Sequence, residues 1–256
     1  MRMLALALLL LVAAPAPAAM PGKAVLDHLA KGLRTTQVGD WVTYKLDGGG
    51  ARVHFWRLAV VGEEKDKLGR DALWLEMEWG THPAMKAPLA QIRMLIARGD
   101  GVAFDPNAIT RLIVAIGFDR PQEYSQEALD WALTKHDPPG ESAAPAAPPQ
   151  RLPDPPVVRS GRETRLMTPA GTVTAVPVEV MYRSTVIKRT WVSREIPILQ
   201  LAKIEIPRIS HALEVAEYGV NARPRMLLPE PKTPLVKLEY AEKAFPQLPW
   251  LEEENP

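Results

Sequence analysis

Cysteine is absent from the 256-residue sequence. Many small exported domains depend on disulfides for their stability, and this chain cannot form any. Its folded state must therefore rely on an apolar core. A lipid attached through a cysteine at the amino-terminal cleavage region is excluded for the same reason.

An excess of either charge is also lacking. The chain carries 31 basic and 30 acidic residues, for a formal net charge of +1. This balance gives no electrostatic reason to expect a nucleic acid or an anionic membrane surface as a partner. Beyond the leader described below, no stretch is apolar enough to span a membrane as a helix, so we expect no transmembrane segment in the mature chain.

Recognisable catalytic and metal-binding motifs are missing as well. No two of the five histidines have metal-ligand spacing on one element, and no serine has the setting of a nucleophile elbow. Glu76 and Glu78 share a strand face, as acid–base carboxylates do, but a solvated outer face is the simpler interpretation. His82, in a loop near Trp79, is the histidine of most interest. We expect no enzyme, no cofactor and no metal ion; a hydrolase with an unrecognised site is the alternative.

What the sequence does have is an export signal at its amino terminus. A basic start, Met1–Arg2, precedes the apolar run Leu4–Ala14, and Ala16–Ala18 fits a small-x-small cleavage site. The run is too short to cross a bilayer as a helix. These features predict a signal peptide over residues 1–19 and a soluble periplasmic protein. Association with the outer membrane through a partner is left open.

Alternating apolar residues predict antiparallel strands in the next part of the chain. An amphipathic helix that ends near Arg34 comes first. A Gly-rich turn at 47–50 then joins two strands, and a polar hairpin tip at 62–71 leads to a third. The second strand is apolar on both faces, which predicts that both are covered. The inward residues of the first and third strands are Val42, Tyr44, Leu46, Leu73, Leu75, Met77 and Trp79.

Helical spacing predicts the elements that follow. Residues 89–96 fit either a helix or a strand, and the helix is favoured. Residues 109–116 carry a stripe of Ile109, Leu112, Ile113 and Ile116, which Gly117 would end. Ser125 is a candidate N-cap for a further short helix.

Proline dominates residues 137–156, which predicts a linker or surface insertion. We expect residues 20–136 to hold the helix, the first strands and the helical insertion. Residues 157–220 should add the remaining strands to the same sheet; two separate domains are the alternative. Residues 221–256 hold too many prolines for a sheet and are predicted to wrap the surface or stay loose.

The segment Arg189–Ile206 changes its apolar face along its length. Ile196 and Ile198 share one face of an extended chain, whereas Leu199 and Leu201 share the other. A proline within a strand belongs at its first residue, at an edge or at a bulge, and a bulge reverses the face downstream. We therefore expect an irregular, curved strand here; coverage of both faces by other elements is a compatible explanation.

This segment resembles the strand–turn–strand of periplasmic lipoprotein-carrier proteins, the LolA family. A tryptophan strand ends in a polar turn, and a proline then opens a strand with a lysine and an acidic residue. Here those features fall at Trp191, Ser193, Pro197, Lys203 and Glu205. Gly39–Leu46 is similar to a first strand of such envelope proteins. The arginine that holds those carriers closed cannot be assigned between Arg52 and Arg57.

The resemblance implies an α+β fold: a strongly curved antiparallel sheet, or half-barrel, with helices covering its concave face. It also implies an apolar cavity for lipid or an acylated protein. Flexible methionines suit such a cavity, but they also fill ordinary cores. A scaffolding component of an envelope-spanning assembly, docking other envelope proteins, is the alternative. The expected cavity lining is Tyr44, Phe55, Leu75, Met77, Trp79, Ile109, Leu112, Ile113, Val178, Val180 and Trp191.

Overall fold

The computed structural model describes residues 28–29, 31–48, 53–98, 108–134, 156–209 and 211–237. The predicted signal peptide, nearly all of the proline-rich segment and the end of the chain lie outside these residues. So does Arg52.

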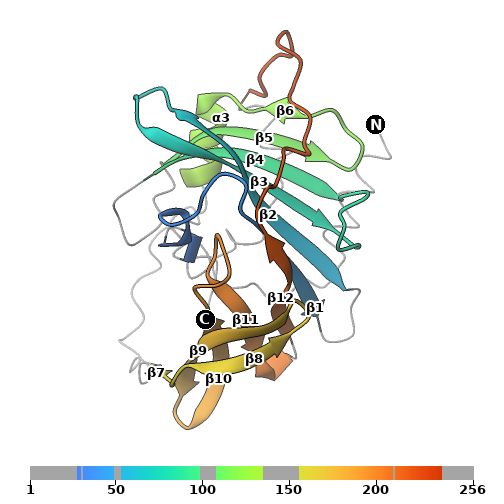
Figure 1. Cartoon of the computed structure of the whole chain (residues 1–256). Helices are drawn as coiled ribbons and strands as arrows, with labels where there is room; N and C mark the ends of the chain where they lie inside the picture. Colours follow the sequence, from blue (N-terminus) through green and yellow to red (C-terminus); the bar gives the residue numbers. More distant parts are fainter. Residues whose placement is uncertain are drawn as a thin grey trace, which may run out of the picture.

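Antiparallel strands make up most of the described chain. They form a single sheet in the order β6-β5-β4-β3-β2-β1-β12-β11-β10-β9-β7, with β8 paired to β9. Figure 1 shows β2 to β6 in the upper half and β7 to β11 in the lower half, joined through β1 and β12. The strands are β1 (Trp41–Gly48), β2 (His54–Lys65), β3 (Asp71–Gly80), β4 (Ala90–Ala97), β5 (Ile109–Ile116), β6 (Gln122–Glu123), β7 (Val157–Ser160), β8 (Thr164–Thr168), β9 (Gly171–Tyr182), β10 (Thr185–Val192), β11 (Leu201–Ile206) and β12 (His211–Gly219).

The predicted fold class, α+β with helices over a concave face, is wrong. Apart from a short helical stretch at residues 28–29 and 31–33, the described helices are α3 (Gln126–Thr134) and the 3-10 turn η2 (Pro207–Ile209). These helices do not cover a face of the sheet. The N-cap prediction is confirmed, because the Ala128 backbone N–H donates to Ser125 Oγ at 3.2 Å at the start of α3.

Two segments predicted as helices are strands. Residues 90–97 form β4 and residues 109–116 form β5, and the two strands pair along their length. The error has a physical cause, since both strands are buried on both faces. In β5, Leu112 and Val114 belong to one core cluster, while Ile113 belongs to the other. A strand buried on both sides reads as a continuous apolar run, and helical spacing can be found in such a run by chance.

The main core lies on one face of the sheet. It combines side chains from β1 to β5 with Leu29 and Leu33 of the N-terminal helical stretch and Leu129 of α3. The lower half of the sheet curls towards this core, since Val173 of β9 also lies within it. The Ala170 N–H, at the β8–β9 turn, donates to the Val215 carbonyl at 3.3 Å.

The opposite face of the upper half is covered by residues 220–237, which we call the C-terminal segment. In Figure 1 this segment runs in red from the end of β12 across β2 to β5 and reaches β6. Ala222 N–H donates to the Gly39 carbonyl at 2.7 Å, and Val236 N–H donates to the Glu123 carbonyl at 2.8 Å. Met226, 3% exposed, packs in a second apolar cluster with Trp74. Of the predicted tail, residues 221–237 lie over the sheet, and residues 238–256 lie outside the described residues.

Residues 196–200, predicted as part of a curved strand, instead join the predicted polar turn at 193–195 in one loop between β10 and β11, residues 193–200. We call them the inserted loop. Pro197 therefore lies in a loop and does not open a strand, which corrects the expectation drawn from the resemblance. The change of apolar face arises because the loop turns its backbone through left-handed conformations, at Ile198 (φ 69°) and Gln200 (φ 54°).

Candidate functional site

The inserted loop fills apolar space on the main core face. Ile196 and Ile198 are 0% exposed and Leu199 is 1% exposed, and all three belong to the main core cluster. Figure 1 shows this orange loop rising from the lower half of the molecule towards its middle. An irregular loop therefore supplies much of the apolar filling at this position.

The backbone of the inserted loop is strained. A positive φ is a genuine outlier for a β-branched residue such as Ile198, because its side chain crowds the backbone there. Such strain persists only where the surroundings impose it, and it is common at sites of binding and conformational change. Within the loop, the Leu199 N–H donates to the Pro197 carbonyl at 2.8 Å, and the Ser193 N–H donates to the Gln200 carbonyl at 2.9 Å.

The N-terminal helical stretch holds the loop in place. Gly32 lies so close to Ile198 that an added Cβ would stand 1.6 Å from the Ile198 carbonyl oxygen. The Gln200 side-chain amide donates to Thr35 Oγ1 at 3.3 Å. On the other side, Glu195 Oε1 accepts the Thr174 N–H of β9 at 3.2 Å. The loop is therefore attached to the fold by a close backbone approach and a few polar contacts.

Several residues of the expected lining share the main core cluster with the inserted loop. Tyr44, Leu75, Met77, Ile109 and Leu112 belong to the same buried cluster as the loop, with Trp79 and Trp191 packed against it. The Tyr44 hydroxyl donates to the Leu201 carbonyl, directly after the loop, at 3.1 Å. Burial raises the pKa of the Tyr44 phenol well above its ordinary value, which keeps this donor protonated.

The other expected lining residues lie elsewhere. Ile113 belongs to the second cluster, on the opposite face. Phe55 alternates with the core residue Trp56 along β2, so it also faces away from the main core. Val178 and Val180 are half-buried in β9, near the lower edge of the sheet.

The three buried residues of the inserted loop were not among the expected lining. A signal for them was present in the sequence: the apolar face changed around a proline between two strands. The alternation of side chains between two faces holds only for an extended chain. The signal therefore indicated an irregular segment, but not that its side chains point into the core.

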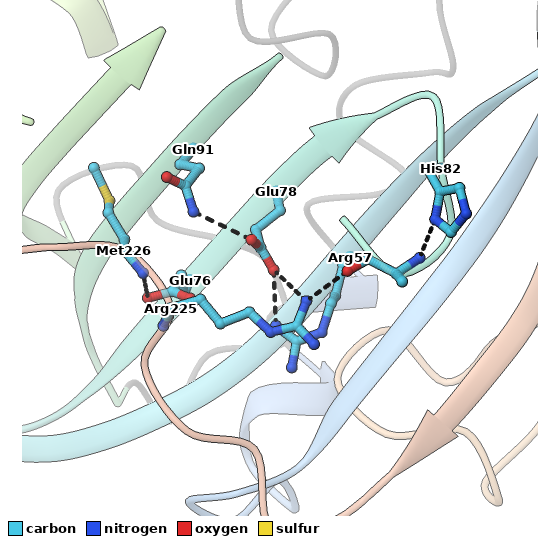
Figure 2. A network of polar contacts seen from close by, with 8 residues as sticks. Arg57, Glu76, Glu78, His82, Gln91, Arg225 and Met226 are labelled. Carbon is cyan, nitrogen blue, oxygen red and sulfur yellow. Dashed lines mark hydrogen bonds and ion pairs between the residues drawn. The ribbon is translucent and has the colours of Figure 1, made fainter. Parts of the chain in front are cut away.

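On the opposite face, Glu78 is the centre of a buried ionic network (Figure 2). Glu78 Oε2 accepts from the Arg57 guanidinium at 3.0 Å and from the Arg225 guanidinium at 3.3 Å, and Oε1 accepts from the Gln91 amide at 3.1 Å. Arg57 also lies over the Trp41 ring, 5.4 Å from its centre. Burial and the nearby Arg225 lower the pKa of Arg57, although Glu78 opposes this shift.

Glu76 attaches the C-terminal segment to the same face. Its two carboxylate oxygens accept the backbone N–H groups of Arg225, at 2.9 Å, and Met226, at 3.1 Å (Figure 2). Burial raises the pKa of Glu76 in spite of these two hydrogen bonds. The expectation of a solvated outer face is therefore wrong: Glu76 is 0% exposed and Glu78 is 2% exposed. The sequence did not indicate that a segment nearly 150 residues away covers them.

His82, the histidine of most interest, has a local role. Its Nδ1 accepts the Ala84 N–H at 3.1 Å, within the turn after β3. Trp79 stacks instead on His54, with ring centres 5.6 Å apart.

Comparison with known proteins gives distant likenesses in structure. No protein-family model matches the chain, and no curated protein matches it. MucB in complex with MucA(peri) has a TM-score of 0.37 and 14% identity over 78% of this chain. The MucA/MucB complex of Pseudomonas aeruginosa has a TM-score of 0.36 and 16% identity over 80% of this chain. An exported protein with a YmcC-like fold from Bacteroides fragilis has a TM-score of 0.32 and 10% identity, with 72% of this chain and 97% of that chain covered.

The chain spans 55% and 59% of the length of the two MucB chains. Within the described residues, no helix has both the length and the apolar character that crossing a membrane requires.

Proposed function

We propose that this chain is an exported, non-enzymatic protein that binds the acyl chain of a lipid or acylated protein in the space that the inserted loop fills. One observation carries the proposal. Three fully buried apolar side chains belong to a strained loop, with Ile198 in a left-handed conformation. Outward movement of this loop would open apolar space in the main core, the cluster to which Tyr44, Leu75 and Leu112 also belong.

Burial of the loop side chains and burial of an acyl chain in the same space contribute free energies of similar size. Burying an aliphatic side chain contributes about 1.5–3 kcal/mol, so the three loop residues together contribute on the order of 5–9 kcal/mol. An acyl chain of roughly 16 carbons gains on the order of 10 kcal/mol at about 0.8 kcal/mol per CH₂. Replacement of the loop by the ligand is therefore close to balanced, as loading and release both require.

The buried carboxylates support a non-enzymatic role. Glu76 is occupied by two backbone N–H groups, and Glu78 by two arginines and an amide. Both lie under the C-terminal segment, which fits a structural function better than acid–base chemistry on a substrate.

The first test is direct. The mature chain is purified from exporting cells and extracted with organic solvent, and the extract is examined by mass spectrometry. Uptake of a fluorescent fatty acid is measured in parallel. We expect a co-purified lipid and saturable uptake; the absence of both would contradict the proposal.

The second test holds the loop in place. Because the chain has no cysteine, the variant Thr35→Cys/Gln200→Cys can be joined selectively by a short bis-reactive thiol linker such as dibromobimane. We expect the linked form to take up the fatty acid at least tenfold more weakly than the unlinked form. The matched control is Lys65→Cys/Asp71→Cys, across the fixed pair of β2 and β3, where linking should leave uptake unchanged. Equal uptake by the linked and unlinked forms of the first variant would mean that the loop does not move.

A further inference from the structure

Strand β7 is an exposed edge of the sheet. It is the last strand in the sheet order, and it pairs with β9 from Val157↔Met181 to Ser160↔Val178. All four of its residues are exposed, with Val157 at 51% and Val158 at 64%. Within the described chain, no strand pairs with its outer side. An edge of this kind presents unpaired N–H and C=O groups, to which an extended peptide can add as a further strand.

Three arginines follow this edge. Arg159 lies in β7, Arg162 in the connection and Arg165 in β8. In the described part of the chain, none of the three guanidinium groups has an ion pair or a hydrogen bond to a side chain. Glu179, opposite Arg159 in the β7–β9 pair, already accepts from Arg189 Nε at 2.7 Å. With Glu163 as the only acidic residue between β7 and β8, this edge carries an excess of positive charge.

We propose that the outer edge of β7 binds an extended acidic segment of a partner protein as an added β-strand. Backbone hydrogen bonds to β7 would give the affinity, and the three arginines would select for carboxylates on the peptide. A membrane surface fits less well. Val157 and Val158 are neighbours in a strand, so their side chains point to opposite faces and cannot enter one lipid surface together. The inference does not depend on the acyl-binding proposal, because β7 lies outside the main core.

The test uses the full mature chain and a fluorescent peptide of sequence ETEVETEV, with binding followed by anisotropy at low and moderate salt. We expect saturable binding that weakens as salt rises. A basic counterpart, KTKVKTKV, should not bind. An acidic peptide that is N-methylated at alternate residues should bind at least tenfold more weakly, because it lacks the N–H groups of one edge.

Two variants with the same change in net charge distinguish the effect of the edge arginines on peptide binding from the effect of overall charge. Arg159→Glu/Arg162→Glu/Arg165→Glu should weaken binding at least tenfold. Lys67→Glu/Lys86→Glu/Lys232→Glu changes the net charge equally at exposed lysines elsewhere and should bind like the wild type. If the N-methylated peptide binds as tightly as the unmodified acidic peptide, binding does not occur by strand addition. If the arginine and lysine variants weaken binding equally, the site is not at these arginines. Binding to vesicles of anionic lipid without binding to the acidic peptide would assign the arginines to a membrane.

Discussion

At the scale of single residues, the contact of Gly32 with Ile198 decides how closely the inserted loop can pack. In an ordinary helix, alanine is more stable than glycine by up to about 1 kcal/mol. Here the added Cβ would stand 1.6 Å from a backbone carbonyl oxygen, which cannot move as a flexible side chain can. The steric cost is therefore larger than the gain in helix propensity.

We predict that Gly32→Ala lowers the free energy of unfolding by about 1–3 kcal/mol, the usual cost of overpacking. Urea denaturation followed by tryptophan fluorescence measures this change. Gly62→Ala is the matched control, because its added Cβ meets the Trp74 side chain at an ordinary 3.6 Å. Equal stability of Gly32→Ala and the wild type would show that the loop does not rest on Gly32.

Asp66 is a second residue with a defined contribution to stability. Burial would raise the pKa of its carboxyl, but hydrogen bonds from the Arg70 side chain and from the Arg70 and Leu68 N–H groups bring this pKa below its ordinary value. A group whose pKa is lower in the folded state stabilises the fold above its unfolded pKa. This stabilisation is lost as the pH falls through the folded value.

We therefore predict that the wild type is more stable than Asp66→Asn at pH 6, and that the difference shrinks as the pH falls towards 2. Urea denaturation at a series of pH values measures it. Asp71→Asn, whose carboxylate is largely exposed beside Lys65, should show a much smaller difference at pH 6. A difference for Asp66→Asn that stays constant down to pH 2 would contradict this explanation.

At the scale of elements, the C-terminal segment depends on one buried carboxylate. Glu76 accepts N–H groups from two successive residues of the segment, so both of its oxygens are needed as acceptors. In Glu76→Gln, an amide NH₂ replaces one of these oxygens and faces a backbone donor. An unsatisfied buried donor costs about 1–3 kcal/mol, so the segment should detach more often.

We predict that trypsin cleaves Glu76→Gln faster than the wild type after Arg225, whereas the Arg223–Pro224 bond resists trypsin in both. Limited proteolysis under native conditions, with fragments identified by mass spectrometry, measures the rate. Glu230→Gln is the control, since it removes only the exposed ion pair with Arg120 and should leave the rate unchanged. If both variants are cleaved at the wild-type rate, Glu76 does not hold the segment.

At the scale of the whole molecule, the two parts of the chain on either side of the proline-rich segment share one sheet. β1 pairs with β12 over its whole length, and the main core takes side chains from both parts. Burial of this shared core would hold the two parts together after the connection between them is cut.

We predict that a chain with a protease site inserted within residues 137–156 stays one particle after cleavage. Size-exclusion chromatography should give co-eluting fragments, and tryptophan fluorescence and circular dichroism should report one common unfolding transition. Separation of the fragments under native conditions would show that the parts are independent domains.

The sequence by itself determined the elements whose apolar pattern is one-sided or whose cap is local. The alternation of Val42 and Tyr44 predicted β1, and that of Leu73, Leu75 and Met77 predicted β3. The Ser125 cap predicted α3, because its hydrogen bond to Ala128 spans three residues. Such patterns depend on neighbours along the chain, so the sequence contains them in full.

Only the tertiary structure decided the rest, because the deciding contacts join distant parts of the chain. β4 and β5 are strands because a second layer, with Met226, covers their other face, which a pattern of apolar residues does not show. Glu76 is buried because the C-terminal segment binds it, and Arg57 is buried beside Glu78, with which it pairs. The inserted loop points into the core because Gly32 leaves room for the Ile198 carbonyl, a steric fit between two segments more than 160 residues apart.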